Sequence, residues 1–429
     1  MIPGLRHNLL ALGVDHSVFM IGLSFASQAT ILPAFAAHLG AANVVIGAIP
    51  AVMTLGWFLP SLFAAGHTEA LGRKLPFVVR YTVWERAPFL VLALAAFLLA
   101  ERAPAVTLAV LLLMLLTLTG VGGVLMPAWM DIIGRAIPVT VRGRFFAGSS
   151  LVAGVGGFAG SFVTARILST VPAPASYGVC FLCAAACMAV SFAALVLVRE
   201  PPAAAAAPPV ALRAYLARVP ALLRRDRNLR WFLLARALGM IGGIGNGFYT
   251  VYALAAWAPP DSQVGVFTAL LLVGQVAGTV TLGWLADRAG HRLVLVTGLA
   301  AMVGAGALAL AAPSLEAFGG VFVLAGVQGS AITISNLNVL LEFAPSPEER
   351  PTYIGLGTTS LAPVAFGAPL VAGLLADAWG FAAVFGVAVA AGTIALIVLT
   401  GMVIDPRETT GERVTQTDHQ VTERQRTDA

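Results

Sequence analysis

Charged residues are scarce in this chain. Of its 429 residues, 10% are Asp, Glu, Lys or Arg, whereas a soluble globular domain carries about 25%. Hydrophobic residues make up 59% of the chain, and its mean hydropathy is +0.90. This balance excludes an ordinary water-soluble domain and predicts a protein embedded in a lipid bilayer.

Lysine is nearly absent, since Lys74 is the only lysine among the 25 basic residues. The arginines lie between apolar runs and do not gather on one amphipathic face, so the net charge of +5 does not indicate a nucleic-acid partner.

We expect no cleavable signal peptide at the N-terminus. Met1–Asn8 is short, and the apolar run after it has no small-residue cleavage site.

Cysteine is limited to Cys180, Cys183 and Cys187, which share one helix face in an apolar run. That run has no His, Asp or Glu to complete a metal site, so we interpret the three as small buried hydrophobic residues. The chain also lacks a phosphate-binding Gly-x-x-x-x-Gly-Lys-Ser/Thr loop and the HExxH and GxSxG motifs. We therefore expect no metal, no cofactor, no ATP-driven step and no enzymatic activity.

Long apolar runs dominate what is present. About twelve of them are long enough to cross a bilayer as helices, which predicts an all-α polytopic membrane protein with twelve transmembrane helices. They cover residues 9–36, 44–65, 76–100, 105–130, 145–170, 176–198, 229–257, 263–282, 293–312, 315–341, 353–376 and 380–404.

Basic residues concentrate on alternate connections between these runs. One side carries Arg73, Lys74, Arg135, Arg288 and Arg292 among others, and the opposite connections hold Arg102 and almost nothing else that is basic. Because basic loops remain cytoplasmic, we predict a multi-pass protein of the cell membrane with both termini in the cytoplasm.

One long internal connection divides the chain. We expect an N-terminal six-helix bundle over 1–198, a cytoplasmic linker over 199–228, a C-terminal six-helix bundle over 229–404 and a disordered tail over 405–429. The linker begins with a Pro/Ala spacer and continues as a basic amphipathic segment, which we expect to lie on anionic lipid headgroups.

The two predicted bundles share a short loop motif. The stretch Gly283–Arg292 places Asp287, Arg288 and Arg292 between two spans, and Gly66–Lys74 is a weaker copy. Aligning Gly72 with Gly290 gives an offset of 218 residues, and the same offset places Gly47 on Gly265. Such an offset, close to half the chain, indicates one structural unit used twice.

Six spans, a basic linker, six further spans and this loop in each half resemble the major facilitator superfamily of transporters. In that family the loop works as a cytoplasmic latch between the two bundles. The resemblance implies a gate, for which Asp131 is expected to meet Arg73, and Glu342 to meet Arg288 or Arg292. The predicted gate residues are Glu69, Arg73, Asp131, Asp287, Arg288, Arg292 and Glu342.

Polar residues inside the spans form stripes on the first, fourth, seventh and tenth runs, which line the central cavity in the resembled family. Packing between helices is the alternative for isolated Ser, Thr and Asn residues. Because the stripes are aligned, we interpret them as cavity lining. The candidates are Ser24, Gln28, Thr117, Asn246, Thr250, Gln328, Ser335 and Asn338.

Four ionisable residues lie deep within the spans: Asp15, Glu85, Arg86 and Arg236. Buried charges of this kind are functional candidates by default, and here they suggest proton coupling. Fixed ion pairs are the alternative, with Arg86 as a candidate partner of Asp15.

The sequence thus predicts a secondary transporter that moves a small molecule by alternating access, with proton coupling expected and a monomer as the working unit. A non-transporting membrane sensor or scaffold remains an alternative, as does a membrane-embedded enzyme.

Overall fold

The computed structural model describes residues 4–69, 71–201, 222–344, 353, 356–357 and 360–405. Within these ranges the secondary structure is helical throughout, without a strand. The elements are α1 (Leu5–Ser24), α2 (Ile31–His38), α3 (Asn43–Glu69), α4 (Leu75–Arg86), α5 (Pro88–Leu98), α6 (Pro104–Ala136), α7 (Val139–Thr170), α8 (Ala175–Val196), α10 (Arg227–Gly242), the short 3₁₀ helix η1 (Gly243–Gly247), α11 (Tyr249–Trp257), α12 (Gln263–Ala289), α13 (His291–Ala311), α14 (Leu315–Phe343), α16 (Ala362–Trp379) and α17 (Phe381–Gly401).

Ten spans in the described part of the chain are helices long and apolar enough to cross a membrane, with α4 and α5 counted as one. The other two predicted spans, 9–36 and 229–257, are broken helices. The first consists of α1 and α2, and the second of α10, η1 and α11. The prediction of an all-α polytopic membrane fold is therefore confirmed. Most of the predicted linker (202–221) and tail (406–429) lies outside the described residues.

The internal repeat extends to the breaks in these two spans. The ends of α1 and α10, Ser24 and Gly242, are 218 residues apart, as are the first residues of α2 and α11, Ile31 and Tyr249. This is the offset that relates the two loop motifs. The two halves therefore share the interrupted first span as well as the loop.

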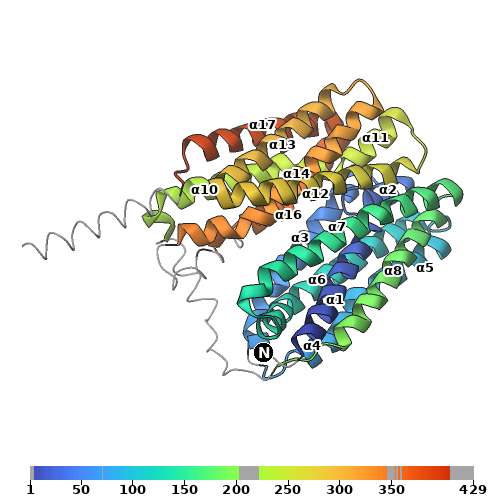
Figure 1. Ribbon diagram of the computed structural model, residues 1–429. Coiled ribbons are helices and arrows are strands. Elements are labelled where there is room, and N and C mark those ends of the chain that lie inside the picture. Colours follow the sequence, from blue (N-terminus) through green and yellow to red (C-terminus); the bar gives the residue numbers. More distant parts are fainter. Residues whose placement is uncertain are drawn as a thin grey trace, which may run out of the picture.

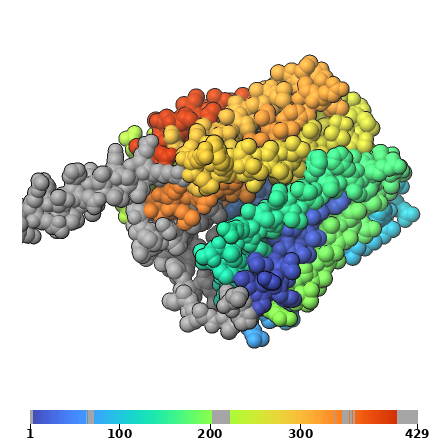
Figure 2. Space-filling view, viewed as in Figure 1, coloured from blue at the N-terminus to red at the C-terminus, as the bar shows by residue number. Residues whose placement is uncertain are grey.

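The helices pack as two bundles (Figure 1). In the first, α1 packs on α7 and α8, and α3 packs on α6. In the second, α10 packs on α17, and α14 packs on α12 and α13. The bundles meet along two seams, α3 against α16 and α7 against α12. In Figure 2, α7 in teal lies directly against α12 in yellow.

A glycine sits at the closest approach in each seam. A Cβ added to Gly265 of α12 would lie 2.6 Å from the backbone nitrogen of Ala165 in α7. A Cβ added to Gly47 of α3 would overlap the carbonyl oxygen of Pro369 in α16. Because Gly47 and Gly265 are related by the 218-residue offset, the two seams are equivalent in the repeat.

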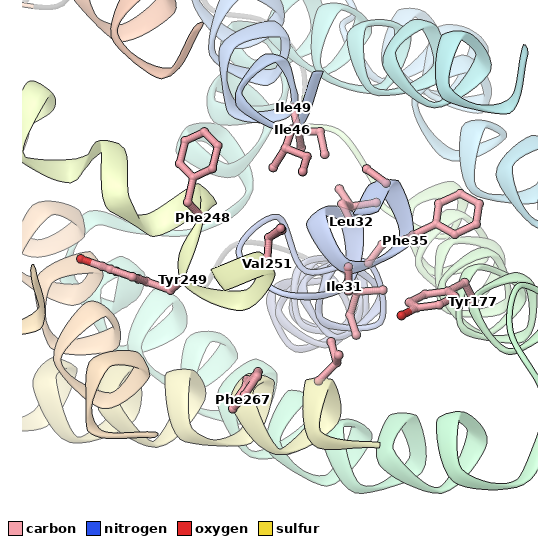
Figure 3. Packing of buried hydrophobic residues seen from close by; sticks show 14 of the residues in the cluster. Ile31, Leu32, Phe35, Ile46, Ile49, Tyr177, Phe248, Tyr249, Val251 and Phe267 are labelled. Carbon is pink, nitrogen blue, oxygen red and sulfur yellow. The ribbon is translucent and has the colours of Figure 1, made fainter. Parts of the chain in front are cut away.

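The bundles also share a buried apolar cluster around α2 and α11 (Figure 3). Ile31 and Phe35 of α2 are completely buried, and Phe248, Tyr249 and Val251 of the second half belong to the same cluster. This cluster lies at the end of the molecule that carries α2 and α11, which we call the far end. The opposite end carries Arg73, Arg135, Arg288 and Arg292, and we call it the basic end.

Candidate functional site

A cavity of about 1220 Å³ lies between the two bundles. It is lined by α1, α3 and α7 of the first half and by α10, η1, α11, α12, α13, α14, α16 and α17 of the second. Small-molecule sites usually measure about 300–1,000 Å³, so the volume is ample for a small organic ligand. The cavity extends toward the basic end, where Ala147 of α7, Phe232 of α10 and Val280 of α12 line it.

Contacts between the halves close the far end. The Asp377 carboxylate of α16 accepts hydrogen bonds from the backbone nitrogens of Asn43 and Val44, at 3.0 and 3.1 Å, and from Asn43 Nδ2 at 2.9 Å. Asp377 thus caps the first turn of α3 from across the seam, satisfying donors that have no partner within that helix. Nearby, the hydroxyls of Thr30 and Thr268 are 2.6 Å apart.

At the basic end, the gate candidates of the first half form a local network. Asp131 of α6 pairs with Lys74 Nζ at 2.8 Å and with Arg135 Nη2 at 2.6 Å. Glu200 accepts hydrogen bonds from the backbone nitrogens of Lys74 and Leu75 and so caps α4. Asp131 was expected to meet Arg73. Its partner is Lys74, because the Lys74 side chain points into the protein while the neighbouring Arg73 is exposed.

The gate candidates of the second half also engage their own bundle. Arg292 donates to the carbonyl oxygens of Leu399 and Thr400 at the end of α17. The guanidinium of Arg288 lies 4.2 Å from the ring centre of Trp284, a cation–π contact. Asp287 is exposed and Glu342 half-buried. The side chain of Glu69 lies outside the described part of the structure.

Of the eight predicted cavity residues, Ser24, Gln28, Asn246 and Gln328 line the cavity. The Asn246 Nδ2 group donates to Gln328 Oε1 at 3.0 Å, which joins η1 to α14. The other four bond to helices instead. Thr117 and Asn338 donate to carbonyls one turn earlier, Thr250 donates to Ala29, and Ser335 meets the ring of His291.

The tenth span lines the cavity with a face rotated from the predicted stripe. That face runs through Ala325, Gln328, Ile332 and Asn336, at spacings of three, four and four residues. Asn336 was not predicted, although an asparagine at this helical spacing from Gln328 is a readable signal. His16 of α1 is a second cavity residue that the sequence did not indicate.

Arg236 of α10 also lines the cavity. Its Nη1 atom is buried without a hydrogen-bond partner in the described part of the chain. The centre of the Phe232 ring lies 5.9 Å from the guanidinium carbon of Arg236. Arg236 lies apart from Asp15, Glu85 and Arg86, because α10 belongs to the second bundle and those three residues belong to the first.

The other three ionisable candidates meet inside the first bundle. Arg86 Nη2 binds Asp15 Oδ1 at 2.8 Å, and Arg86 Nη1 lies 3.3 Å from Glu85 Oε2. Thr82 donates to Glu85, and Ser191 donates to Asp15 at 2.7 Å. Asp15, Glu85 and Arg86 are each at most 9% exposed. Two carboxylates thus share one guanidinium in a site screened from water.

Two aromatic side chains connect this cluster with the cavity. Trp129 Nε1 donates to Asp15 Oδ2 at 3.1 Å, and the Trp129 ring lies 5.8 Å from the ring of His16, centre to centre. His16 lines the cavity. The buried carboxylates are therefore separated from the cavity by one tryptophan and one histidine.

Comparison with known proteins gives a consistent result. Residues 246–425 match the family model described as Major Facilitator Superfamily. The search of curated proteins returned no match. Among solved structures, a mutant form of the nucleoside transporter NupG superposes with a TM-score of 0.73 at 14% identity, covering 92% of this chain and 99% of that one.

Two further structures share the fold at 15% identity. One is a bacterial homologue of the human lysosomal transporter Spinster, with a TM-score of 0.64 over 95% of this chain and 96% of that one. The other is a bacterial homologue of the iron transporter ferroportin, with a TM-score of 0.65 over 93% and 98%. The second half of the chain therefore matches the Major Facilitator Superfamily model, and the chain as a whole shares the fold of these solved transporter structures.

Proposed function

We propose that this protein is a secondary transporter that carries a small molecule across the cell membrane by alternating access. The observation that carries the proposal is the cavity between the two halves, closed at the far end by contacts between α2, α3, α11 and α16. A sensor or scaffold needs no such chamber. Because one chain supplies both walls of the cavity, a monomer is sufficient for this cycle.

In this cycle the halves rock about the cavity. Exposure to the far side requires the bonds of Asp377 to Asn43 and Val44 to break, while the basic end closes. The gate residues Asp287 and Arg288 then meet the other half. We assign the basic end to the cytoplasm from its arginines, so the present arrangement faces inward. The Spinster and ferroportin homologues named above are likewise described as inward-facing.

We further propose that protons drive the cycle through Asp15, Glu85 and Arg86. With all three ionised, the cluster carries one excess negative charge, which one bound proton would neutralise. His16, which lines the cavity and is the residue next to Asp15, is the group through which a proton would pass between the cavity and this cluster, while Trp129 orients the Asp15 carboxylate. A rigid set of ion pairs would need neither the second carboxylate nor contact with a cavity residue.

The test is uptake by purified protein in liposomes. Ligands that raise the melting temperature of the protein are supplied as radioactive tracers, with and without a pH gradient, and protein-free liposomes serve as control. We expect saturable uptake that an inward-directed or outward-directed pH gradient accelerates. Binding without uptake above the control would contradict transport, and uptake unaffected by any pH gradient would contradict proton coupling.

A further inference from the structure

The cavity carries an unbalanced positive charge. Among the described residues that line it, Arg236 and His16 are the only side chains that can carry a positive charge, and no Asp or Glu is present. Arg86, which is buried in the first bundle, is held between Asp15 and Glu85. Arg236 has no such counter-ion in the described residues. A buried charge without a partner is costly, so a group outside the described residues is expected to supply the negative charge.

Two side-chain amides of the same cavity are also incompletely bonded. The Oδ1 atoms of Asn246 and Asn336 are buried without a hydrogen-bond partner. Buried polar groups are bonded in the great majority of cases, and exceptions within a cavity point to a missing ligand or water. A hydroxyl group suits either orientation of an amide, because it both donates and accepts hydrogen bonds.

The spacing along two helices brings these groups together. The contacts Phe232–Phe343 and Asn246–Gln328 show that α10 and α14 run antiparallel, since chain numbers rise along one as they fall along the other. Arg236 lies ten residues before Asn246, and Asn336 lies eight residues after Gln328. At 1.5 Å per residue these separations are about 15 and about 12 Å, so Arg236 and Asn336 lie at nearly the same depth.

We propose that Arg236, Asn336 and the Asn246–Gln328 pair form a binding site for a small hydroxylated organic monocarboxylate. The carboxylate pairs with Arg236, and hydroxyl groups of the ligand donate to the free Oδ1 atoms of Asn336 and Asn246. A single guanidinium balances one negative charge, whereas a phosphate dianion would leave excess charge in a cavity walled largely by apolar residues. This assignment rests on the proposed transport function, since it names the class of substrate.

The experiment measures binding to the purified full-length protein by titration calorimetry. The probes are glycerate, gluconate and quinate, each beside its neutral amide, and 6-phosphogluconate. We expect at least one of the three monocarboxylates to bind at least tenfold more tightly than its amide and than the phosphorylated probe. Equal binding of acid and amide, or no binding of any acid, would overturn the assignment.

Variants then locate the site. Arg236→Gln should weaken binding of that acid at least tenfold, Arg236→Lys should restore part of it, and Asn336→Leu should weaken it with the guanidinium intact. Arg166→Gln is the matched control, because Arg166 lies in α7 but does not line the cavity and is exposed. A monodisperse peak in size-exclusion chromatography checks each fold. Should Arg236→Gln not fold, the Asn336→Leu and Arg236→Lys affinities decide the outcome.

Failure of this assignment and failure of the transport proposal give different results. If a neutral ligand is taken up by the liposomes while no acid binds, transport stands and the anion site is wrong. If an acid binds through Arg236 but is never taken up, the site stands and transport is wrong. Unchanged affinity for the acid in Arg236→Gln would show that the anion binds elsewhere.

Discussion

The carboxylates of Asp15 and Glu85 differ in how fully they are hydrogen-bonded. Both oxygens of Asp15 are bonded, to Arg86, Ser191 and Trp129. Glu85 accepts a hydrogen bond from the Thr82 hydroxyl and a longer one from Arg86. Gly122 of α6 packs against the Glu85 carboxylate. Removing Glu85 leaves a neutral Asp15–Arg86 pair, whereas removing Asp15 breaks the better-bonded side of the cluster.

We therefore predict that replacing Glu85 impairs proton coupling, whereas replacing Asp15 impairs stability. Glu85→Gln should retain nearly the wild-type melting temperature and exchange tracer across the membrane, but lose pH-driven accumulation. Asp15→Ala should lower the free energy of unfolding by about 3–5 kcal/mol, the usual result of removing one partner of a buried ion pair. Counterflow and pH-driven accumulation are measured in the same liposomes. Full pH-driven accumulation by Glu85→Gln would remove this residue from the coupling mechanism.

A second prediction at this scale concerns Asp377. Loss of a helix cap costs about 0.5–2 kcal/mol, and about 1.4 kcal/mol changes the ratio of two states tenfold. Because Asp377 caps α3 only while the far end is closed, Asp377→Ala should shift the protein toward a state open at that end.

Spin labels at Ala41 and Asp261, in a chain whose three cysteines are replaced, report the separation of the two halves at the far end by double electron–electron resonance. We expect Asp377→Ala to add a population at longer distance. Glu316→Ala is the control, since Glu316 is an exposed acid in the first turn of α14 at the same end. An unchanged distance distribution in Asp377→Ala would mean that the cap does not hold the halves together.

At the scale of elements, the seams between the bundles depend on glycines. Gly265 packs against the backbone of Ala165, while Gly283, on the same helix α12, has no atom within 4 Å of an added Cβ. Gly265→Ala should force α12 and α7 apart and lower the melting temperature. Gly283→Ala should raise stability by up to about 1 kcal/mol, because alanine favours a helix over glycine. Thermal unfolding of both variants in the same detergent compares them. A stabilised Gly265→Ala would mean that the seam has room to spare.

The helices also show which features of the fold the sequence alone predicts. Apolar run length located the spans, and the 218-residue offset correctly indicated a repeat, because both depend on patterns many residues long. Which face of a helix lines the cavity is harder to predict, because successive residues point about 100° apart around the helix axis. Asn336 and Asn338 are thus only two residues apart, yet Asn336 alone lines the cavity.

Partner choice at the loops was equally hard to read. Arg73 and Lys74 are adjacent and both basic, and only the packing of α4 against α6 decides that Lys74 meets Asp131. The break at η1 is signalled by Gly242, Gly243, Gly245 and Gly247. The stretch between α1 and α2 contains no glycine, and there the break is found by applying the 218-residue repeat.

At the scale of the whole molecule, the contacts between the halves are concentrated at the far end. Asp377, Thr30 and the α2–α11 cluster all join the halves there. At the basic end, Lys74, Asp131 and Arg292 bond within their own half. In the cycle proposed above, the two states differ mainly in which end carries the contacts, and a ligand or mutation acts through its preference for one of them.

Asp287 should stabilise the other state of the cycle, in which the basic end is closed and the far end is open. It is exposed here, so Asp287→Asn should leave expression and melting temperature nearly unchanged. In the other state, the closed basic end brings its loop against the first half, and the substitution should destabilise that state and slow transport. The spin-label pair gives a direct measurement: combined with Asp377→Ala, Asp287→Asn should reduce the long-distance population that the first change creates. If the double variant keeps that population and Asp287→Asn transports at the wild-type rate, the loop is only a turn between α12 and α13.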